Sequence, residues 1–435
     1  MAISAFQLPQ EVWFHVFRFL QPHEKGNIRS TCKFFKVVID HPALWRKHTV
    51  VLKNIRSYDS QFWATLRRRR TTSVVVHKAG VKEWERLATA LPFLTSLTIV
   101  QCSDPKTLCT IERFKDLRRL AIRSFQCPPG LAGVLASLGH LTNLCLCELS
   151  GAPGADLIGA VSKLSNLTTL LYHESDKPIP KKAFHTMLSS LPHLKHLSLK
   201  MGVLYGTLPG DYFILPKVNR DPNVIGEPCG SEFGLAKLEL LSYMDPILPP
   251  AGLDGLQCLQ SLTIEYRDRA VESDRCHLKT WLSKLPCLTE LTVTRGYPLN
   301  VYARVIPRTL TSLSLPLVFL SLRDMQVVAR QAPGLQHLHT DLWSSDGHAC
   351  LRELPRLFCQ LRTLSLRDLN VTEMDFLGLA RLRYLEKLVL LDPNPGPSLE
   401  LLGLIREFRE RTNHGVQVVH SLPRGDPAAC CCYLY

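Results

Sequence analysis

The sequence predicts an α/β fold: a solenoid of stacked strand–helix repeats with a curved parallel sheet, preceded by a small all-α segment. The pattern apolar-x-x-apolar-x-x-apolar-x-apolar occurs intact ten times between residues 91 and 390, and imperfect copies begin at Pro307 and Ala332. Successive copies start 21–29 residues apart, except for one interval of 44 before the copy at Leu235. A stack of such repeats presents a long binding surface rather than a catalytic cleft.

The N-terminal segment, residues 8–45, lacks this pattern and begins with a helix-length run, Glu11–Leu20. The apolar residues of this run are Val12, Trp13, Phe14, Val16, Phe17, Phe19 and Leu20. They cover nearly the whole circumference of a helix, whereas a helix with one solvated side carries a single apolar stripe. A segment of about 40 residues cannot bury all of this surface internally. We expect part of it to contact another chain or the repeats; the alternative is a hydrophobic cap on the first repeat.

The same segment resembles an F-box. Its opening Leu8, Pro9 and Glu11 match the family's Leu-Pro-x-Glu, and Leu44-Trp45 matches the closing Leu-Trp. Between them, Val12, Val16, Phe19, Leu20 and Pro22 match the aromatic-aliphatic helix and the Pro that follows it, and Thr31, Cys32, Phe34 and Phe35 stand where the family has a VC-x-x-W/F stretch. The chain departs from the family at Lys25 and Gly26, where leucines are usual, and at Thr31 and Phe34, where valine and tryptophan are usual.

The resemblance implies an F-box domain at 1–48 that docks onto a Skp adaptor. The contacts that it implies are Leu8, Pro9, Glu11, Val12, Val16, Phe19, Leu20, Leu44 and Trp45.

Residues 49–72 are interpreted as a basic linker. Residues 1–72 hold 13 Lys and Arg against 4 Asp and Glu, and the linker ends in the run Arg67–Arg70. A solenoid that grips phosphate backbones would carry the basic excess itself. We therefore expect no nucleic-acid partner. A nuclear-import or acid-binding patch is the alternative role for the arginines.

The region 73–420 resembles a leucine-rich-repeat array of about 12–13 repeats, because its spacing falls in the range of about 20–29 residues typical of that family. Alternating leucines face one side of a short strand. The intervening stretches, such as 81–91, have helical character. The dense Gly and Pro of 202–234 predict a loop insertion, with a degenerate repeat as the alternative. A helix over 398–411 and a strand over 416–419 are expected to cap the array.

Target binding is predicted at strand positions that point away from the leucines. They include Arg119, Arg123, His196, Lys200, Glu265, Glu290, His337, His339 and Arg367. An acidic or phosphorylated target segment near Arg119, Arg123 and Lys200 is one reading; scattered solvated side chains are the other. His337, His339 and Asp341 resemble a metal-binding trio, but no fourth ligand is apparent, so no metal site is expected.

The end of the chain, residues 421–435, is a cysteine-rich tail. Cys432 stands four residues from the terminus, where prenylation would require it, but Tyr435 is not a usual terminal residue for that modification. A frayed, reducible tail is the favoured interpretation. No run of 18 apolar residues occurs and the cysteines never form C-x-x-C, so we expect no membrane partner and a cytoplasmic or nuclear protein.

Sequence motifs of nucleotide, zinc-protease or hydrolase sites are absent, so neither enzymatic activity nor a cofactor is expected. The two resemblances together imply a substrate receptor of a Skp–cullin–F-box ubiquitin ligase. Its partners would be the Skp adaptor, the cullin scaffold and the RING subunit reached through that adaptor, and a protein target. The alternatives are a leucine-rich-repeat scaffold or regulator outside the ligases, and a nucleic-acid-binding protein.

Overall fold

The computed structural model describes most of the chain between Leu8 and Ser421. Outside the description lie residues 1–7, 47, 102–105, 124–129, 150–153, 174–177, 203–204, 215–233, 270–274, 342–346, 368–371, 393–395 and 422–435. The chain divides into two compact units between Leu167 and Thr168. Within the part of the chain that the structure describes, no helix has the length and apolar character needed to cross a membrane.

Unit 1 begins with a helical segment whose helices pack around a core of their own. They are α1 (Gln10–Arg18), α2 (Pro22–Thr31), α3 (Lys33–Ile39) and the 3-10 turn η2 (Pro42–Leu44). Phe17, Val38, Ile39 and Leu44 are buried at the centre, and Trp13, Phe14, Leu20, Ile28, Phe35 and Trp45 pack against them. The rings of Trp13 and Phe35 meet edge to face at 4.9 Å. The all-α prediction for this segment is confirmed.

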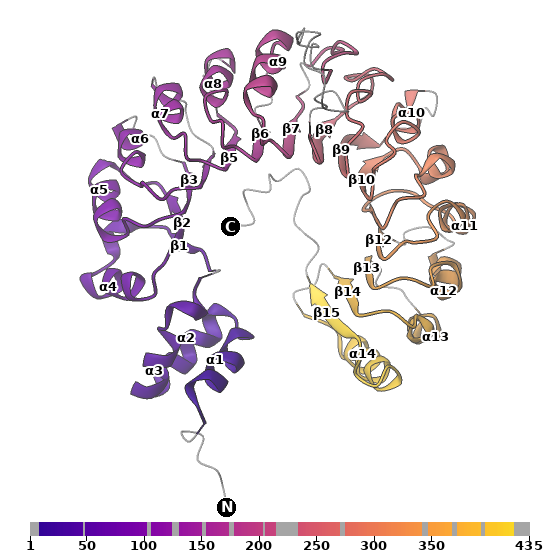
Figure 1. Cartoon of the computed structure of the whole chain (residues 1–435). Helices are drawn as coiled ribbons and strands as arrows, with labels where there is room; N and C mark the ends of the chain where they lie inside the picture. Colours follow the sequence, from indigo (N-terminus) through magenta and orange to yellow (C-terminus); the bar gives the residue numbers. More distant parts are fainter. Residues whose placement is uncertain are drawn as a thin grey trace, which may run out of the picture. The chain divides into compact units, whose positions relative to one another are not determined.

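The rest of unit 1 alternates strands with helices. Its elements are β1 (Val50–Leu52), η3 (Ile55–Ser57), α4 (Ser60–Arg68), β2 (Ser73–His77), α5 (Val81–Ala90), β3 (Ser96–Val100), α6 (Lys106–Ile111), β4 (Arg119–Arg123), α7 (Leu131–Ser137), β5 (Asn143–Cys147) and α8 (Gly154–Val161). Strands β1 to β5 are parallel and follow sequence order. Helices cover one face of this sheet, and we call the other its open face (Figure 1).

The linker interpretation of 49–72 is wrong, because this segment folds as a strand and a helix. Strand β1 pairs with β2 in parallel, with Val50 opposite Val74. Helix α4 buries Trp63 and Leu66, and Asp59 caps its N-terminus by accepting a hydrogen bond from the amide of Phe62 at 2.7 Å. The repeat array therefore begins before residue 73.

Unit 2 continues the same alternation. Its elements are β6 (Thr169–His173), α9 (Lys181–Ser190), β7 (His196–Lys200), β8 (Lys237–Tyr243), β9 (Ser261–Arg269), α10 (Leu278–Leu282), β10 (Glu290–Gly296), η5 (Leu299–Val301), η6 (Ala303–Val305), β11 (Ser312–Leu315), α11 (Leu322–Gln331), β12 (His337–Asp341), α12 (Gly347–Leu357), β13 (Thr363–Arg367), α13 (Glu373–Gly378), η7 (Leu379–Arg381), β14 (Lys387–Leu391), α14 (Leu399–Arg411) and β15 (Gln417–Ser421). Strands β6 to β15 also follow sequence order, and helices again cover one face (Figure 1). The predicted α/β solenoid is confirmed, including its final helix and strand.

The leucines align from strand to strand, and this alignment corrects the predicted register of the repeat that contains β8. Leu197 of β7 pairs with Leu238 of β8, and Leu238 pairs with Leu262 of β9. The buried strand leucines of β8 are thus Leu238 and Leu240, whereas Leu241 is only half-buried. The copy assigned to Leu235 is therefore shifted by three residues. The adjacent leucines of this strand satisfy the pattern in either register, and burial decides between them.

Strands β8 to β10 are lengthened and irregular at their C-terminal ends. The register of β10 against β9 shifts between Thr294 and Gly296. Gly296 has a φ of +73°, and a Cβ atom there would lie 2.3 Å from the ring of Tyr266. Only glycine combines this backbone conformation with the close approach of a ring.

Candidate functional site

Helix α1 carries an exposed apolar stripe. Leu8, Val12, Val16 and Phe19 are 39%, 40%, 43% and 73% exposed, and we call this set the α1 stripe. Val12 and Val16 lie one turn apart on α1, while Leu8 stands just before the helix and Phe19 is its C-cap, each three or four residues from the next. Phe17 is buried among the helices behind them. Helix α1 is therefore apolar on two sides, one that holds the segment together and one that faces outward, as docking surfaces do.

The other residues predicted to touch an adaptor divide between surface and interior. Pro9 precedes α1 and Glu11 lies in its first turn, and both are exposed. Leu20 is half-buried against the core and Leu44 is 4% exposed. The indole of Trp45 donates a hydrogen bond to the carbonyl of Ile39. The last three residues therefore support the fold of the segment, while the first two lie beside the α1 stripe.

Two surface residues of α3 were not predicted as contacts. Phe34 is 37% and Val37 is 69% exposed, and they stand three residues apart on this helix. They form a second apolar side on the same helical segment. In the sequence, Phe34 is a departure from the family pattern and Val37 belongs to no motif.

Lys25, another departure from that pattern, is buried inside the segment. It is 1% exposed, and its ammonium group donates to the carbonyl of Leu44 at 3.2 Å and lies 2.9 Å from Nε2 of His48. Burial lowers the pKa of Lys25. This lysine occupies a position where the family has an apolar side chain, and its polar tip is satisfied by the last residue of η2 and by His48 beyond it.

The open face of unit 1 gathers positive charge near the ends of its strands. The pKa of His77 is lowered by burial and by the charges of Lys53, Arg123 and Lys78. Arg123 is buried, and its Nε lies 3.8 Å from a carboxylate oxygen of Glu148. Arg119 is exposed at the start of β4. The structure places both predicted arginines on the open face, but only Arg119 offers an exposed side chain.

The open face of unit 2 holds an ion-paired glutamate that the sequence analysis missed. Glu239 lies in β8, with Oε1 at 2.8 Å from Nζ of Lys237 and 3.3 Å from Nε2 of His196 on β7. Burial would raise its pKa, but the hydrogen bonds and charges of His196 and Lys237 prevail and lower the pKa of Glu239 to about 2. The shifted leucine register explains the omission, since it placed Glu239 outside the positions taken to face a target.

Other predicted residues of this face are spread over separate strands. Lys200 is half-buried at the end of β7 and Glu265 is buried in β9, whereas Glu290 is exposed at the start of β10. A further buried pair on this face joins Nε2 of His173 to the hydroxyl of Ser198 at 2.9 Å. The structure therefore supplies a long polar strip rather than one convergent site.

The trio His337, His339 and Asp341 lies on β12 but does not converge. His337 is exposed, and Nδ1 of His339 lies 3.0 Å from the hydroxyl of Ser314. Asp341 accepts a hydrogen bond from the amide of Leu317 at 2.8 Å, and burial raises its pKa. Its other neighbours are Nε2 of His339 at 3.8 Å and Nη1 of Arg367 at 4.0 Å. Among the described residues, no three His, Cys, Asp or Glu side chains are placed to hold a metal ion.

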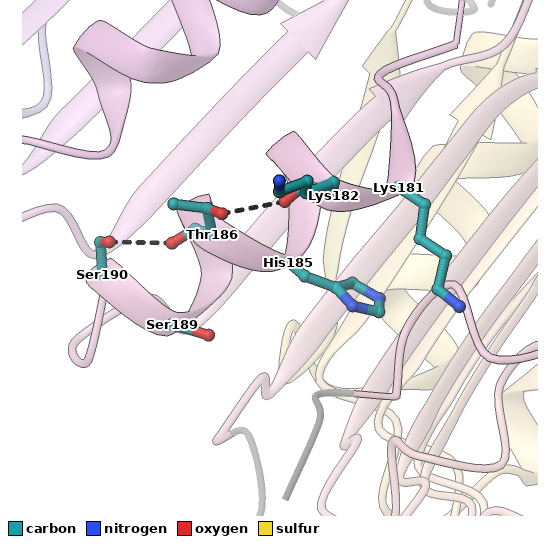
Figure 2. Close-up of a pocket in the computed structure, with 6 residues that line it drawn as sticks. All are labelled: Lys181, Lys182, His185, Thr186, Ser189 and Ser190. Atoms are coloured by element: carbon teal, nitrogen blue, oxygen red, sulfur yellow. Dashed lines mark hydrogen bonds between the residues drawn. The ribbon is translucent and has the colours of Figure 1, made fainter. Parts of the chain in front are cut away.

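A shallow pocket runs along helix α9 (Figure 2). Its lining residues all come from this one helix: Lys181, Lys182, His185, Thr186, Ser189 and Ser190. The hydroxyls of Thr186 and Ser190 donate to backbone carbonyls of their own helix at 2.9 Å and 2.8 Å. Nothing here pairs a nucleophile with a base, so this pocket does not carry the chemistry of an active site.

Comparison with known proteins bears on the helical segment at the N-terminus. The model of the F-box-like family matches residues 5–50. The chain joins an F-box-like segment to an array of leucine-patterned strand–helix repeats. An internalin from Listeria monocytogenes is similar in structure at 14% identity and a TM-score of 0.38, over 80% of this chain and 90% of that one. No curated protein sequence matches the chain.

Proposed function

We propose that this protein is the substrate-recognition subunit of a Skp–cullin–F-box ubiquitin ligase. In this role the F-box binds the Skp adaptor and the repeats bind the protein to be ubiquitinated. The observation that carries the proposal is the exposed α1 stripe, which lies within the residues that the F-box-like family model matches. Four large apolar side chains that are exposed on α1 and at its two ends suit this surface to a permanent partner.

The chain itself would make and break no bonds. The adaptor would connect it to the cullin scaffold and, through that scaffold, to the RING subunit and a conjugating enzyme charged with ubiquitin. The contribution of this chain is proximity: a held target meets the charged enzyme at high effective concentration. Such a complex would work in the cytoplasm, the nucleus or both.

The open face would bind the target through its polar strip. Exposed Arg119, Glu290 and His337 and the half-buried Lys200, His196, His339 and Arg367 are the candidate contacts there. In unit 1, the positive charges around His77 favour an acidic segment of the target. In unit 2, Lys237 and Glu239 already neutralise each other, so this part of the face favours a partner of mixed charge.

A pull-down from cell lysate, probed for the adaptor and the cullin, tests the proposal. The wild-type chain should capture both, and the double variant Leu8→Ala, Pro9→Ala should lose both while its circular dichroism is unchanged. A matched control is Leu399→Ala, since Leu399 is 88% exposed on the last helix, α14, far along the chain from the F-box. A wild-type chain that captures neither protein would favour the alternative of a repeat scaffold outside the ligases.

A further inference from the structure

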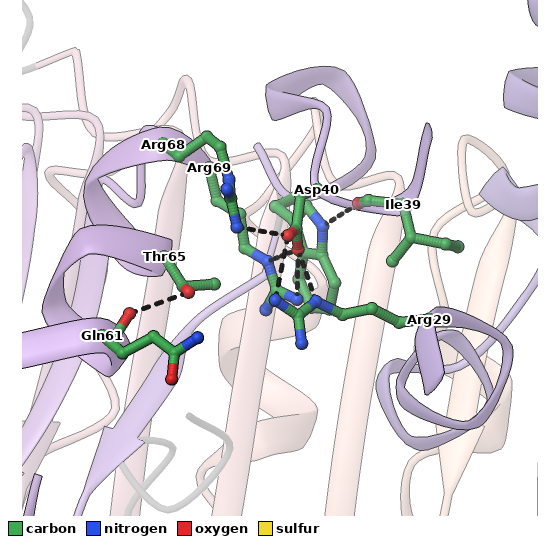
Figure 3. A network of polar contacts seen from close by, with 8 residues as sticks. Arg29, Ile39, Asp40, Gln61, Thr65, Arg68 and Arg69 are labelled. Carbon is green, nitrogen blue, oxygen red and sulfur yellow. Dashed lines mark hydrogen bonds and ion pairs between the residues drawn. The ribbon is translucent and has the colours of Figure 1, made fainter. Parts of the chain in front are cut away.

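Three arginines converge on one buried carboxylate between the F-box and the first repeat (Figure 3). Asp40 ends helix α3 and is 3% exposed. Arg29 donates to it through Nε at 2.9 Å and Nη2 at 3.0 Å. Arg68 donates through Nη2 at 2.6 Å, and Arg69 through Nε at 2.8 Å. We call Asp40, Arg29, Arg68 and Arg69 the Asp40 clasp.

The clasp joins two separate elements. Asp40 and Arg29 belong to the F-box, whereas Arg68 and Arg69 end helix α4 of the first strand–helix pair. The carboxylate has about four acceptor positions, and the guanidinium groups fill them. Burial would raise the pKa of Asp40, but the hydrogen bonds from Arg29 and Arg69 outweigh burial and lower it. Asp40 therefore remains ionised in the folded chain at neutral pH.

Further contacts of the arginine run connect the end of α4 to α5 and to the F-box. Arg67 donates from Nε to the carbonyl of Ala90 at 3.2 Å, at the C-terminal end of α5. The guanidinium of Arg69 lies 3.8 Å from the centre of the Trp45 ring, a cation–π contact with the F-box. Three of the four arginines in the run Arg67–Arg70 therefore make structural contacts. In the sequence alone, the same run resembles a solvated basic linker.

The position of this joint is the end of a repeat array, where a cap is needed. An internal repeat is covered by neighbours on both sides, but a terminal repeat has one neighbour and requires a cap on the other. Strand β1 is only three residues long, and α4, at whose end Arg68 and Arg69 stand, buries Trp63 and Leu66. The part of the chain that meets α4 from the N-terminal side is the F-box, through Asp40.

We propose that the F-box has a second role as the N-terminal cap of the repeat array, with the Asp40 clasp as the joint. The folded state of β1 and α4 then depends on the F-box. Because the two are coupled, a partner that binds and stabilises the F-box also stabilises the first repeat. This role does not require the proposed ligase function, since it concerns the chain alone.

Hydrogen exchange of the full-length chain, read by mass spectrometry, tests the cap. The Asp40→Asn variant should increase exchange about tenfold or more in β1 and α4, because it leaves the arginines without their buried charge. The strands β11 to β14 serve as an internal reference and should keep wild-type exchange. Arg70→Ala is the matched control: Arg70 belongs to the same run, is exposed and lies outside the clasp, so its exchange should equal that of the wild type.

Two results would overturn the proposal. The first is wild-type exchange in β1 and α4 of Asp40→Asn. The second is faster exchange in α1 to α3 alone, which would make the clasp a brace of the F-box and not a cap of the repeats. If Asp40→Asn does not fold, Arg68→Ala is a milder perturbation of the clasp, since the Arg68 side chain is 55% exposed. This variant should then increase exchange in β1 and α4 about threefold. If exchange in β1 and α4 were the same in Arg68→Ala as in Arg70→Ala, the proposed cap would also be refuted.

Discussion

Replacing Glu239 by glutamine should destabilise the chain in a pH-dependent manner. The substitution preserves the shape of the side chain but removes the charge that Lys237 and His196 contact at 2.8 Å and 3.3 Å. The Glu239 side chain is 16% exposed, so this pair is poorly screened by water. The interaction also joins neighbouring strands β7 and β8, and its loss should loosen that pairing.

The magnitude follows from the pKa of Glu239, which falls from 4.5 to about 2 on folding. Each pKa unit corresponds to about 1.4 kcal/mol, so the ionised form contributes at most about 3 kcal/mol. Lys237 is 40% exposed and would become hydrated in the variant, which reduces the expected loss to about 1–3 kcal/mol. A carboxylate with a lowered pKa stabilises the fold above its unfolded pKa. This contribution disappears as the pH falls from about 4.5 to about 2.

Urea unfolding of the wild type and of Glu239→Gln, followed by circular dichroism over a series of pH values, measures this effect. The difference in unfolding free energy should be largest above about pH 5 and should close as the pH approaches about 2. Glu290→Gln is the control, because Glu290 is exposed on the nearby strand β10. A difference that does not vary with pH, or one that Glu290→Gln reproduces, would refute the reasoning.

Four further predictions concern other parts of the chain. Gly296→Ala should cost about 2–4 kcal/mol in urea unfolding, because its Cβ would meet the Tyr266 ring at a positive φ; an unchanged midpoint would contradict this. Lys25→Met should remove a gain in stability that the wild type shows as the pH rises toward about 10.5, since the lowered pKa of Lys25 means that the unfolded chain binds more protons there. Limited proteolysis should cut first within 202–234, of which 203–204 and 215–233 lie outside the described residues; first cuts elsewhere would favour a degenerate repeat. Cys432 also lies outside them, and an intact mass without a lipid would exclude its prenylation.

The leucine pattern predicted the fold because each leucine of the pattern marks a position that faces the core. Leu197, Leu262 and Leu313 occupy equivalent buried strand positions, as the periodicity requires. The same pattern failed where it was ambiguous or too short. Leu238, Leu240 and Leu241 fit two registers, and β1 has only three residues with no leucine template around it. Pairing with a neighbouring strand fixes the register of β8 and reveals β1 as a strand. The periodicity of a single segment carries no information on this pairing.

The functional surfaces were predicted less completely than the fold. Apolar residues all around α1 indicated that some had to face outward, but only packing separates exposed Val16 from buried Phe17. The Asp40 clasp joins residues 11 to 29 positions apart from three helices, and no short motif encodes it. Such long-range charge pairs depend on how elements pack, so they become visible only in the folded structure.

Direct binding of the purified adaptor to the purified full-length chain tests the central claim, that the α1 stripe is an adaptor-docking surface. Isothermal titration should give saturable binding to the wild type. Val16→Asp, which places a charge within the stripe, should weaken this binding about 100-fold or more. Leu399→Asp, an equally drastic change at an exposed leucine of α14, should bind like the wild type. A wild-type chain that does not bind the adaptor, or equal affinities for the two variants, would contradict the account.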